Sequence, residues 1–345
     1  MRIKFIQTII DKLRKKKKPK VLYKTLYFPI YNRFERIDST QPEIYNKYGE
    51  KMSSIFIRDG VLATWNPVRS RHIYWDKYNF ELSYHFYTHN SMLETMGNPK
   101  KKYGALIETQ GIVPDDYRIF DKYKGLNKDF DLIFTYDEKI LNEVDNAKFM
   151  PFWASIKLDF KDIDGSLKLI KDDTYKYKTK NVSILSSNKV GCSLHKLRYD
   201  TAKYIKQNNL ADTFGTFEAE EFIVHQTDKR FVRAYDTLAD YRYSIIFENI
   251  ITDYCFTEKL TNCFAMQTIP IYVGARKISE FFNPDGIIQI SVDDVGSIEK
   301  ILKNCTEEEY NNRLSAVLDN YNRSLMYKNV EDYMYEKYLK NDIGI

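Results

Sequence analysis

The amino-acid sequence predicts an α/β protein built from two domains, and three observations support this class. The chain has 345 residues, which is more than most single domains contain. Segments with the alternation of strands and segments with the periodicity of helices follow one another in both halves. The stretch from Tyr241 to Phe282 reads as strand, turn, helix and second strand, which is the βαβ unit of a parallel sheet.

This βαβ stretch also predicts where a ligand binds. Its first strand is Tyr243 to Phe247, its helix opens at Thr257, and its second strand is Ile269 to Val273. Ligands of open α/β sheets bind outside the carboxyl ends of the strands, so we expect a crevice between the first strand and the helix. The residues expected to line this crevice are Glu248, Asn249, Thr257, Glu258 and Lys259.

These residue types suit a nucleotide sugar. A helix N-terminus offers unpaired amides and a positive partial charge to a phosphate, and Lys259 adds a full positive charge. The carboxylate of Glu258 can accept hydrogen bonds from sugar hydroxyls. The alternative is structural: Glu258 and Lys259 form a solvated first turn, and Glu248 is a local cap. The residues alone leave both interpretations open.

The first half of the chain, residues 21–165, is predicted to form one domain. Asn98 and Pro99 mark a turn before a buried strand, and Glu108 stands at the carboxyl end of that strand. Pro114 opens the next helix, because proline is favoured in the first turn. The strands predicted in this half are Leu22–Phe28, Ser53–Ile57, Gly60–Ala63, Tyr103–Ile107, Asp131–Thr135 and Phe149–Trp153.

Residues 175–325 are predicted to form the second domain, and residues 326–345 a C-terminal helix. The stretch from Lys157 to Lys180 is rich in Lys and Asp and predicts a linker between the domains. Residues 218–233 are polar and predict a surface excursion over the site. Arg230, Arg233 and Arg242 lie near the βαβ stretch, where they either meet a phosphate or, as we favour, pair with neighbouring Asp residues. The other elements predicted are strands Val182–Leu185 and Ile287–Ile290, a helix through Tyr204 and Ile205, and helices from Ser297 onward.

Composition and charge exclude several classes of protein. The net charge of +5 is too small to favour nucleic-acid binding. The four cysteines show neither CxxC pairs nor Cys/His metal spacing, which favours a reducing, cytoplasmic compartment and no structural metal. No run of about 18 apolar residues is present, so we expect no membrane span.

Residues 1–20 form a distinct leader. Ile3, Ile6, Ile10 and Leu13 recur at helical spacing, and a basic cluster extends to Lys20. A basic amphipathic helix of this kind lies on anionic membranes, so the leader predicts a peripheral position on the inner face of a membrane. The alternative is a solvated leader that binds nothing.

The βαβ stretch resembles a known family. Phe247-Glu248-Asn249, seven further residues, Thr257-Glu258-Lys259 and the strand TIPIYVG are similar to the signature of the family 10 glycosyltransferases, the α1,3/α1,4-fucosyltransferases. The similarity extends to FFNPDGII and is far more specific than a lone glycine-rich loop. Cys255 stands where the family has a tyrosine, and Gln267 stands where it has a small residue.

The resemblance implies a fold and an activity. The fold is GT-B, with two Rossmann-like domains facing a cleft. The activity is an inverting transfer of fucose from GDP-fucose to a hydroxyl of a glycan acceptor, in glycan biosynthesis or protein glycosylation, with no cofactor and no essential metal. Two alternatives stay open: the same fold using another GDP-sugar, and an inactive relative that binds glycans.

The resemblance also implies a catalytic base. An inverting transfer needs a base to remove the proton of the acceptor hydroxyl, and the family uses a Glu of the N-terminal domain. Glu108 in IETQGIVPDDY lies where that Glu is expected. The alternative is that Glu108 caps the following turn. Asp115 and Asp116 are rival carboxylates, although both occupy a first helical turn.

An Arg of the family that holds the diphosphate has no single counterpart here. Strict spacing places His195 at its position, with Lys196 beside it and Arg198 further along the helix. Any of the three is a candidate for the phosphate contact, and an Arg suits bidentate contact best. The pairs Asp129/Asp131 and Asp162/Asp164 read as DxD, but such short matches are frequent by chance and we assign neither to a metal.

Overall fold

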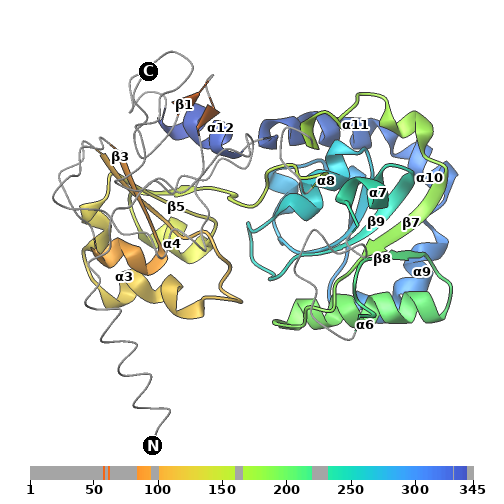
Figure 1. Cartoon of the computed structure of the whole chain (residues 1–345), viewed down its shortest axis with the longest axis horizontal. Coiled ribbons are helices and arrows are strands. Elements are labelled where there is room, and N and C mark those ends of the chain that lie inside the picture. Colours follow the sequence, from red (N-terminus) through yellow and green to blue (C-terminus); the bar gives the residue numbers. More distant parts are fainter. Residues whose placement is uncertain are drawn as a thin grey trace, which may run out of the picture.

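Two parallel sheets form the framework of the computed structural model, which describes residues 57–58, 61–62, 84–94, 101–159, 166–219, 232–328 and 330–339. The N-terminal sheet has the strand order β3-β4-β5-β6 (Tyr84–Thr88, Lys101–Ala105, Leu132–Thr135 and Ala147–Phe149). A short antiparallel pair, β1 (Ile57–Arg58) and β2 (Val61–Leu62), lies apart from it. Figure 1 shows the two sheets in two lobes that lie side by side.

The C-terminal sheet has five parallel strands in the order β11-β10-β9-β7-β8. From β7 the chain first adds β8 on one side, and then places β9, β10 and β11 on the other. The order of the strands therefore reverses between β7 and β9, and such a switch point opens a ligand crevice at the carboxyl ends of the strands. The strands are β7 (Lys180–Leu185), β8 (Asp212–Phe214), β9 (Tyr241–Phe247), β10 (Ile269–Val273) and β11 (Ile288–Gln289).

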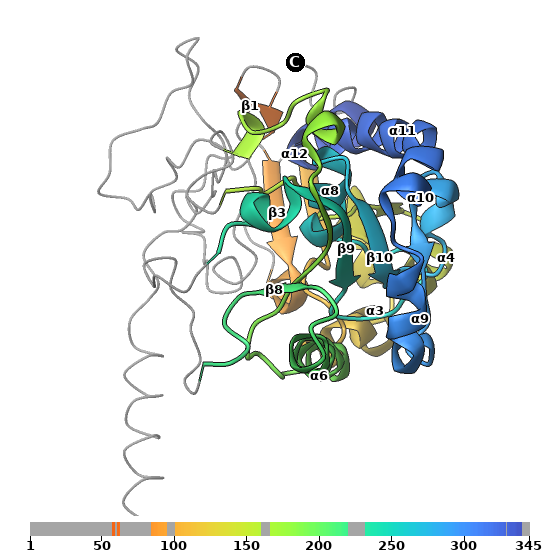
Figure 2. The same ribbon diagram turned by 90° about the vertical axis from the view of Figure 1, so that its right-hand side faces the viewer.

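Alternation in β9 explains how this sheet is covered on both faces. Ile245 and Phe247 belong to the apolar cluster that contains residues of α6 (Ser193–Gln207), whereas Ile246 belongs to the cluster that contains α8 (Glu258–Ala265). Successive side chains of a strand point to opposite faces, so an all-apolar strand is buried on both. Figures 1 and 2 show α6 on one side of the sheet and α8 with α11 (Leu314–Ser324) on the other.

The two lobes are joined by packing as well as by the chain. The hydroxyl of Tyr338 donates to the backbone oxygen of Phe149 at 2.7 Å, and its ring lies 5.7 Å from that of Phe134. The C-terminal segment therefore leaves the second lobe and packs on the first. The remaining helices are α3 (Ile119–Lys122), α4 (Glu138–Glu143), α7 (Ala234–Leu238), α9 (Ile298–Lys303), α10 (Glu307–Asn312) and α12 (Val330–Met334), followed by a π-helical turn (Tyr335–Leu339).

This arrangement confirms the predicted GT-B fold, because two Rossmann-like parallel sheets are joined in one chain. Several predicted elements differ in detail. The element that opens at Pro114 begins as a 3-10 helix (Pro114–Arg118) and becomes α3 only at Ile119. The leader 1–20 and the strand predicted at Leu22–Phe28 lie outside the described residues.

The predicted linker is packed at both ends, although its Lys- and Asp-rich composition predicts a solvated segment. Leu158 is fully buried, and the ammonium of Lys178 donates to the backbone oxygen of Leu238 and to the hydroxyl of Thr268. Burial lowers the pKa of Lys178 to about 7, because desolvation disfavours its charged form. No described helix is long and apolar enough to cross a bilayer.

Candidate active site

A cavity of about 340 Å³ lies at the switch point of the C-terminal sheet. Ser186 and Ser187 reach it from the end of β7, and Thr216 reaches it from the end of β8. Its volume falls at the lower end of the range of small-molecule sites, about 300–1,000 Å³. Its charged lining residues are Lys157, Arg198, Glu258 and Lys259.

A glycine is required at the edge of this cavity. Gly215 follows β8 with a φ of 100°, a conformation that L side chains rarely adopt. A Cβ atom placed there would lie 2.1 Å from the backbone oxygen of Ser186, which is a severe clash. The close approach of these two backbones lets the loops after β7 and β8 share one side of the cavity.

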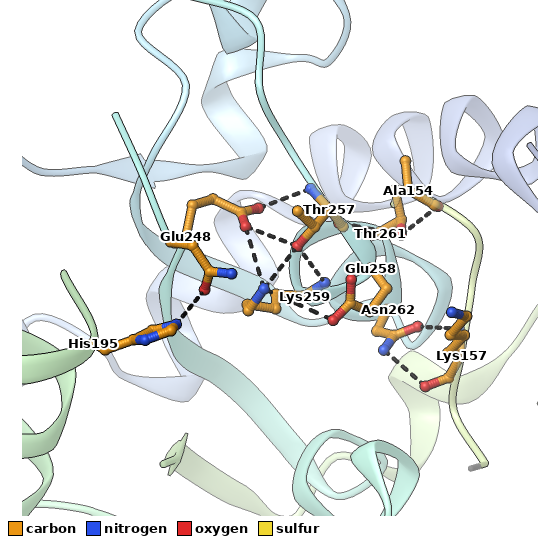
Figure 3. A network of polar contacts seen from close by, with 10 residues as sticks. Ala154, Lys157, His195, Glu248, Thr257, Glu258, Lys259, Thr261 and Asn262 are labelled. Atoms are coloured by element: carbon orange, nitrogen blue, oxygen red, sulfur yellow. Dashed lines mark hydrogen bonds and ion pairs between the residues drawn. The ribbon is translucent and has the colours of Figure 1, made fainter. Parts of the chain in front are cut away.

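The FEN and TEK motifs meet in one polar network (Figure 3). The carboxylate of Glu248 accepts hydrogen bonds from the backbone amide of Thr257 at 2.9 Å and from its hydroxyl at 2.7 Å. The ammonium of Lys259 lies 3.5 Å from Glu248 and 3.7 Å from Glu258. The end of β9 is therefore tied to the start of α8 by a carboxylate, a hydroxyl and an ammonium.

The charges in this network determine which side chains are free for a ligand. Glu248 is 1% exposed, and burial raises the pKa of its carboxyl group despite the nearby Lys259. Burial also acts to lower the pKa of Lys259, but the carboxylates of Glu258 and Glu248 outweigh it and the net shift is upward. Lys259 is thus held charged and 23% exposed at the cavity, with Glu248 behind it. Glu248 and Thr257 support the site, and the geometry does not favour direct ligand contact by either.

The amides at the start of α8 are already bonded, which corrects the expectation that they bind phosphate. The backbone amide of Glu258 donates to the backbone oxygen of Trp153 at 2.6 Å. The amide of Lys259 donates to the hydroxyl of Thr257 at 3.3 Å. The side-chain cations are therefore the groups of this corner that can take up a phosphate charge.

His195 and Asn249 form a second corner of the site. His195 Nε2 and Asn249 Oδ1 lie 2.8 Å apart, and the thiol of Cys192 donates to the backbone oxygen of Asn249 at 3.3 Å. His195 is 3% exposed, and burial lowers its pKa. The ring is therefore engaged in holding Asn249, and it does not line the cavity.

Helix geometry separates the two other candidates for the phosphate contact. Lys196 and Arg198 are two residues apart, which is about 200° around an α-helix, so they leave α6 on opposite sides. Lys196 is 67% exposed and pairs with Asp200 at 2.6 Å. Arg198 lines the cavity, its Nε is buried without a hydrogen-bond partner among the described residues, and burial lowers its pKa.

We therefore expect Arg198→Met to weaken GDP binding by about 10- to 100-fold, because a charge-assisted contact contributes ~1.5–3 kcal/mol. Isothermal titration with GDP measures the effect. Lys196→Met is the matched control, since it removes a cation of the same helix outside the cavity. Equal GDP affinity in the two variants would show that α6 supplies no phosphate contact.

Lys157 is a cavity residue that sequence reasoning missed. Its backbone amide donates to Asn262 Oδ1 at 2.7 Å, and its backbone oxygen accepts from Asn262 Nδ2 at 2.9 Å, as Figure 3 shows. Its ammonium lies 5.5 Å from the ring centroid of Trp153. The sequence placed Lys157 in a linker, and only the pairing with Asn262 brings it to the cavity.

Glu108 lies in the other lobe, three residues beyond the end of β4. It is partly buried, and its carboxylate accepts from the backbone amide of Thr109 at 2.9 Å. The loop that follows Glu108 approaches the C-terminal lobe, because a Cβ atom placed on Gly111 would lie 3.8 Å from the backbone oxygen of Asn249. The structure therefore brings the Glu108 loop to the corner formed by Asn249 and His195.

The structure also places two further residues that the sequence singled out, Asp116 and Cys255. Asp116 lies in a first helical turn as the sequence predicts, and it is buried 3.1 Å from His89. Cys255, at the family's tyrosine position, is 3% exposed and packs in the core of the first lobe with Tyr117 and Tyr136. Arg233 pairs with Asp236 at 2.6 Å as predicted, and Arg230 lies outside the described residues.

Comparison with known proteins adds a family to this geometry. Residues 175–339 match the family described as glycosyltransferase family 10 (fucosyltransferase), C-terminal part. No curated protein sequence gives a significant match. An α1,3-fucosyltransferase structure with GDP-fucose is 17% identical over 74% of this chain and 80% of its own, with a TM-score of 0.40.

Two other solved structures are similar at lower sequence identity. The Anabaena HepE structure in complex with UDP-glucose is 8% identical over 75% of this chain and 79% of its own, with a TM-score of 0.48. TarM is 13% identical over 86% and 67%, with a TM-score of 0.45.

The GT-B fold, the cavity at the switch point and the family match define this protein as a glycosyltransferase. More narrowly, residues 175–339 match the C-terminal part of glycosyltransferase family 10, in agreement with the FEN and TEK motifs.

Proposed function

We propose that this protein transfers fucose from GDP-fucose to a hydroxyl of a glycan acceptor, with inversion at the sugar. The observation that carries the proposal is the cavity at the switch point, which is lined by the cations Lys157, Arg198 and Lys259. Glu258 lines the same cavity, and of these four residues only Lys157 lies outside the segment that matches family 10. Three cations suit a diphosphate, and a partly exposed carboxylate suits ribose hydroxyls. The name of the matched family supports fucose as the sugar.

The proposed mechanism assigns each group a step. Glu108 takes the proton of the acceptor hydroxyl as that oxygen attacks the anomeric carbon from the face opposite the diphosphate. The bond between the anomeric carbon and the diphosphate oxygen breaks, and the leaving GDP gains a negative charge. Arg198, Lys157 and Lys259 stabilise this charge inside a partly desolvated cavity, where electrostatic contacts are strongest.

A donor screen tests the proposal. The protein is incubated with each GDP-sugar and UDP-sugar, with and without glycan acceptors, and nucleotide release is measured. We expect release of GDP from GDP-fucose. Release from a different GDP-sugar alone would support the variant in which the same nucleotide site carries another sugar. Binding of GDP without release from any donor would support an inactive, glycan-binding relative, and release from UDP-sugars alone would contradict the nucleotide assignment.

We also propose that catalysis needs no metal. The candidate pair Asp129/Asp131 sits at the amino end of β5, away from the carboxyl strand ends, and Asp131 is bonded to the backbone amide of Lys102 and the ammonium of Lys101. Asp162 and Asp164 lie outside the described residues. We expect turnover to survive EDTA with at most a modest loss. Complete inactivation that added Mg²⁺ or Mn²⁺ reverses would overturn this proposal.

We propose a peripheral position on the cytoplasmic face of a membrane, supported by the basic amphipathic pattern of residues 1–20. Deleting these residues is expected to leave turnover on soluble substrates intact and to abolish sedimentation with phosphatidylserine vesicles. Neutral phosphatidylcholine vesicles are the control, since the attraction is electrostatic. Equal sedimentation of both proteins with anionic vesicles would contradict the proposal.

A further inference from the structure

We propose that His89 is a positioning residue that holds the backbone of Glu108 in the orientation required for catalysis. The proposal rests on the function proposed above, in which Glu108 is the base. His89 is fully buried, and its Nε2 accepts hydrogen bonds from the backbone amides of Ile107 at 3.1 Å and Glu108 at 3.0 Å. One imidazole nitrogen therefore binds both amides of this dipeptide.

The two amides also fix the tautomer of the ring. A nitrogen that accepts two hydrogen bonds carries no proton, so the proton of the neutral imidazole is on Nδ1. Nδ1 lies 3.1 Å from the carboxylate of Asp116, which is itself 6% exposed. This contact places a negative charge beside Nδ1 without hydrogen-bond geometry, so the two amides, and not Asp116, fix the orientation of the ring.

The oxygens of the same dipeptide are held by side chains as well. The hydroxyl of Tyr117 donates to the backbone oxygen of Glu108 at 2.6 Å, and Trp153 Nε1 donates to the backbone oxygen of Ile107 at 3.0 Å. Backbone pairing with the neighbouring strand ends before this dipeptide. β4 ends at Ala105, and the amide of Leu106 makes the last backbone hydrogen bond to β5, with the oxygen of Phe134. All four backbone groups of Ile107 and Glu108 thus depend on side chains, and His89 satisfies two of them.

His89 holds an uncommon backbone conformation to do this, with a φ of 53°. A non-glycine residue in this region stores strain that the surrounding contacts must outweigh. Removing the imidazole leaves two amides without an acceptor, and the chain must move to hydrate them. A displacement of about 1 Å of a catalytic group lowers rates by up to ~10²-fold.

The test compares His89→Leu, which removes the acceptor, with His89→Gln, whose Oε1 can accept from the same amides. We expect His89→Leu to lower kcat ~10- to 100-fold with unchanged GDP affinity, and His89→Gln to recover much of kcat. Hydrogen exchange at the amides of Ile107 and Glu108 should accelerate in His89→Leu and stay slow in His89→Gln. Val144→Ala is the control for a general loss of stability in the same lobe, since buried Val144 precedes β6 whereas Glu108 follows β4, at the opposite end of the parallel sheet.

The outcomes separate this proposal from the function on which it rests. If the wild-type protein releases no nucleotide from any donor, the proposed function fails, while exchange at the two amides still reports whether His89 holds them. If the wild type is active and Glu108→Gln is not, but His89→Leu retains as much kcat as Val144→Ala, the positioning role is overturned. Unchanged exchange at both amides in His89→Leu overturns it as well.

Discussion

Glu108→Gln is expected to lower turnover by ~10²–10⁴-fold, the usual loss when a general base is removed. The glutamine keeps the shape of the side chain and an oxygen that can accept from the amide of Thr109, so packing and the local turn are preserved. It cannot take a proton from an acceptor hydroxyl. The measurement is the initial rate of GDP release from GDP-fucose with acceptor present.

Two further measurements on Glu108→Gln decide how the result is interpreted. GDP affinity should be unchanged, because the cations of the cavity lie in the other lobe or in the segment that joins the two. The melting temperature should also be unchanged, whereas a fall would point to the capping role. Asp115→Asn is the matched control, since Asp115 is an exposed carboxylate in the same loop region. Near-normal turnover of Glu108→Gln together with a large loss in Asp115→Asn would move the role of base to Asp115.

Lys259→Ala is expected to weaken GDP binding by about 10- to 100-fold and to destabilise the fold. The variant removes a cavity cation and also the ammonium opposite Glu248, which is 1% exposed. Removing one partner of a buried pair leaves an uncompensated charge. We expect the free energy of unfolding to fall by roughly 2–4 kcal/mol, which is less than for a fully buried pair because Lys259 is partly exposed. Chemical denaturation with and without GDP measures both effects.

The pH dependence of this loss has a definite sign. Burial already raises the pKa of Glu248, and loss of Lys259 raises it further. Folded Lys259→Ala then binds a proton at Glu248 that the unfolded chain has released, so its stability falls as pH rises through the acid range towards neutrality. The difference in stability from the wild type is therefore expected to be small near pH 4 and larger at pH 7. A difference that is independent of pH would show that Glu248 does not cause the destabilisation.

A double variant separates the structural from the binding effect of Lys259. Glu248→Gln in the Lys259→Ala background removes the buried charge, and its amide can still accept from the backbone of Thr257 and donate to its hydroxyl. We expect this variant to recover most of the lost stability without recovering GDP affinity. Recovery of both would mean that Lys259 acts only by holding Glu248.

Trp153 connects the two halves of the proposed mechanism. Its indole donates to Ile107 next to the base, its backbone oxygen accepts from Glu258 at the start of α8, and its ring lies beside the ammonium of Lys157. One residue of the segment between the sheets thus contacts the base loop and the donor cavity. The distance between base and donor is set by this segment as well as by the two sheets.

The sequence by itself determined the fold class and the core of the donor half. The apolar run from Tyr243 to Phe247 predicts a buried strand, and the structure buries every residue of β9. The spacing from Glu248 to Thr257 places a helix cap beside the strand end, and the structure closes that distance with two hydrogen bonds. Such relations are local, and periodicity and turn chemistry are sufficient to reveal them.

Only the tertiary structure decided which cations face the cavity and what holds Glu108. Lys196 and Arg198 are equivalent in the sequence, and the packing of α6 turns one to solvent and the other inward. Lys157 reaches the cavity because its backbone pairs with Asn262, which is 105 residues away. His89 binds the amides of Ile107 and Glu108 from a separate segment. Burial and long-range hydrogen bonding leave no periodic trace in the chain, so these roles emerge only once the two lobes are folded.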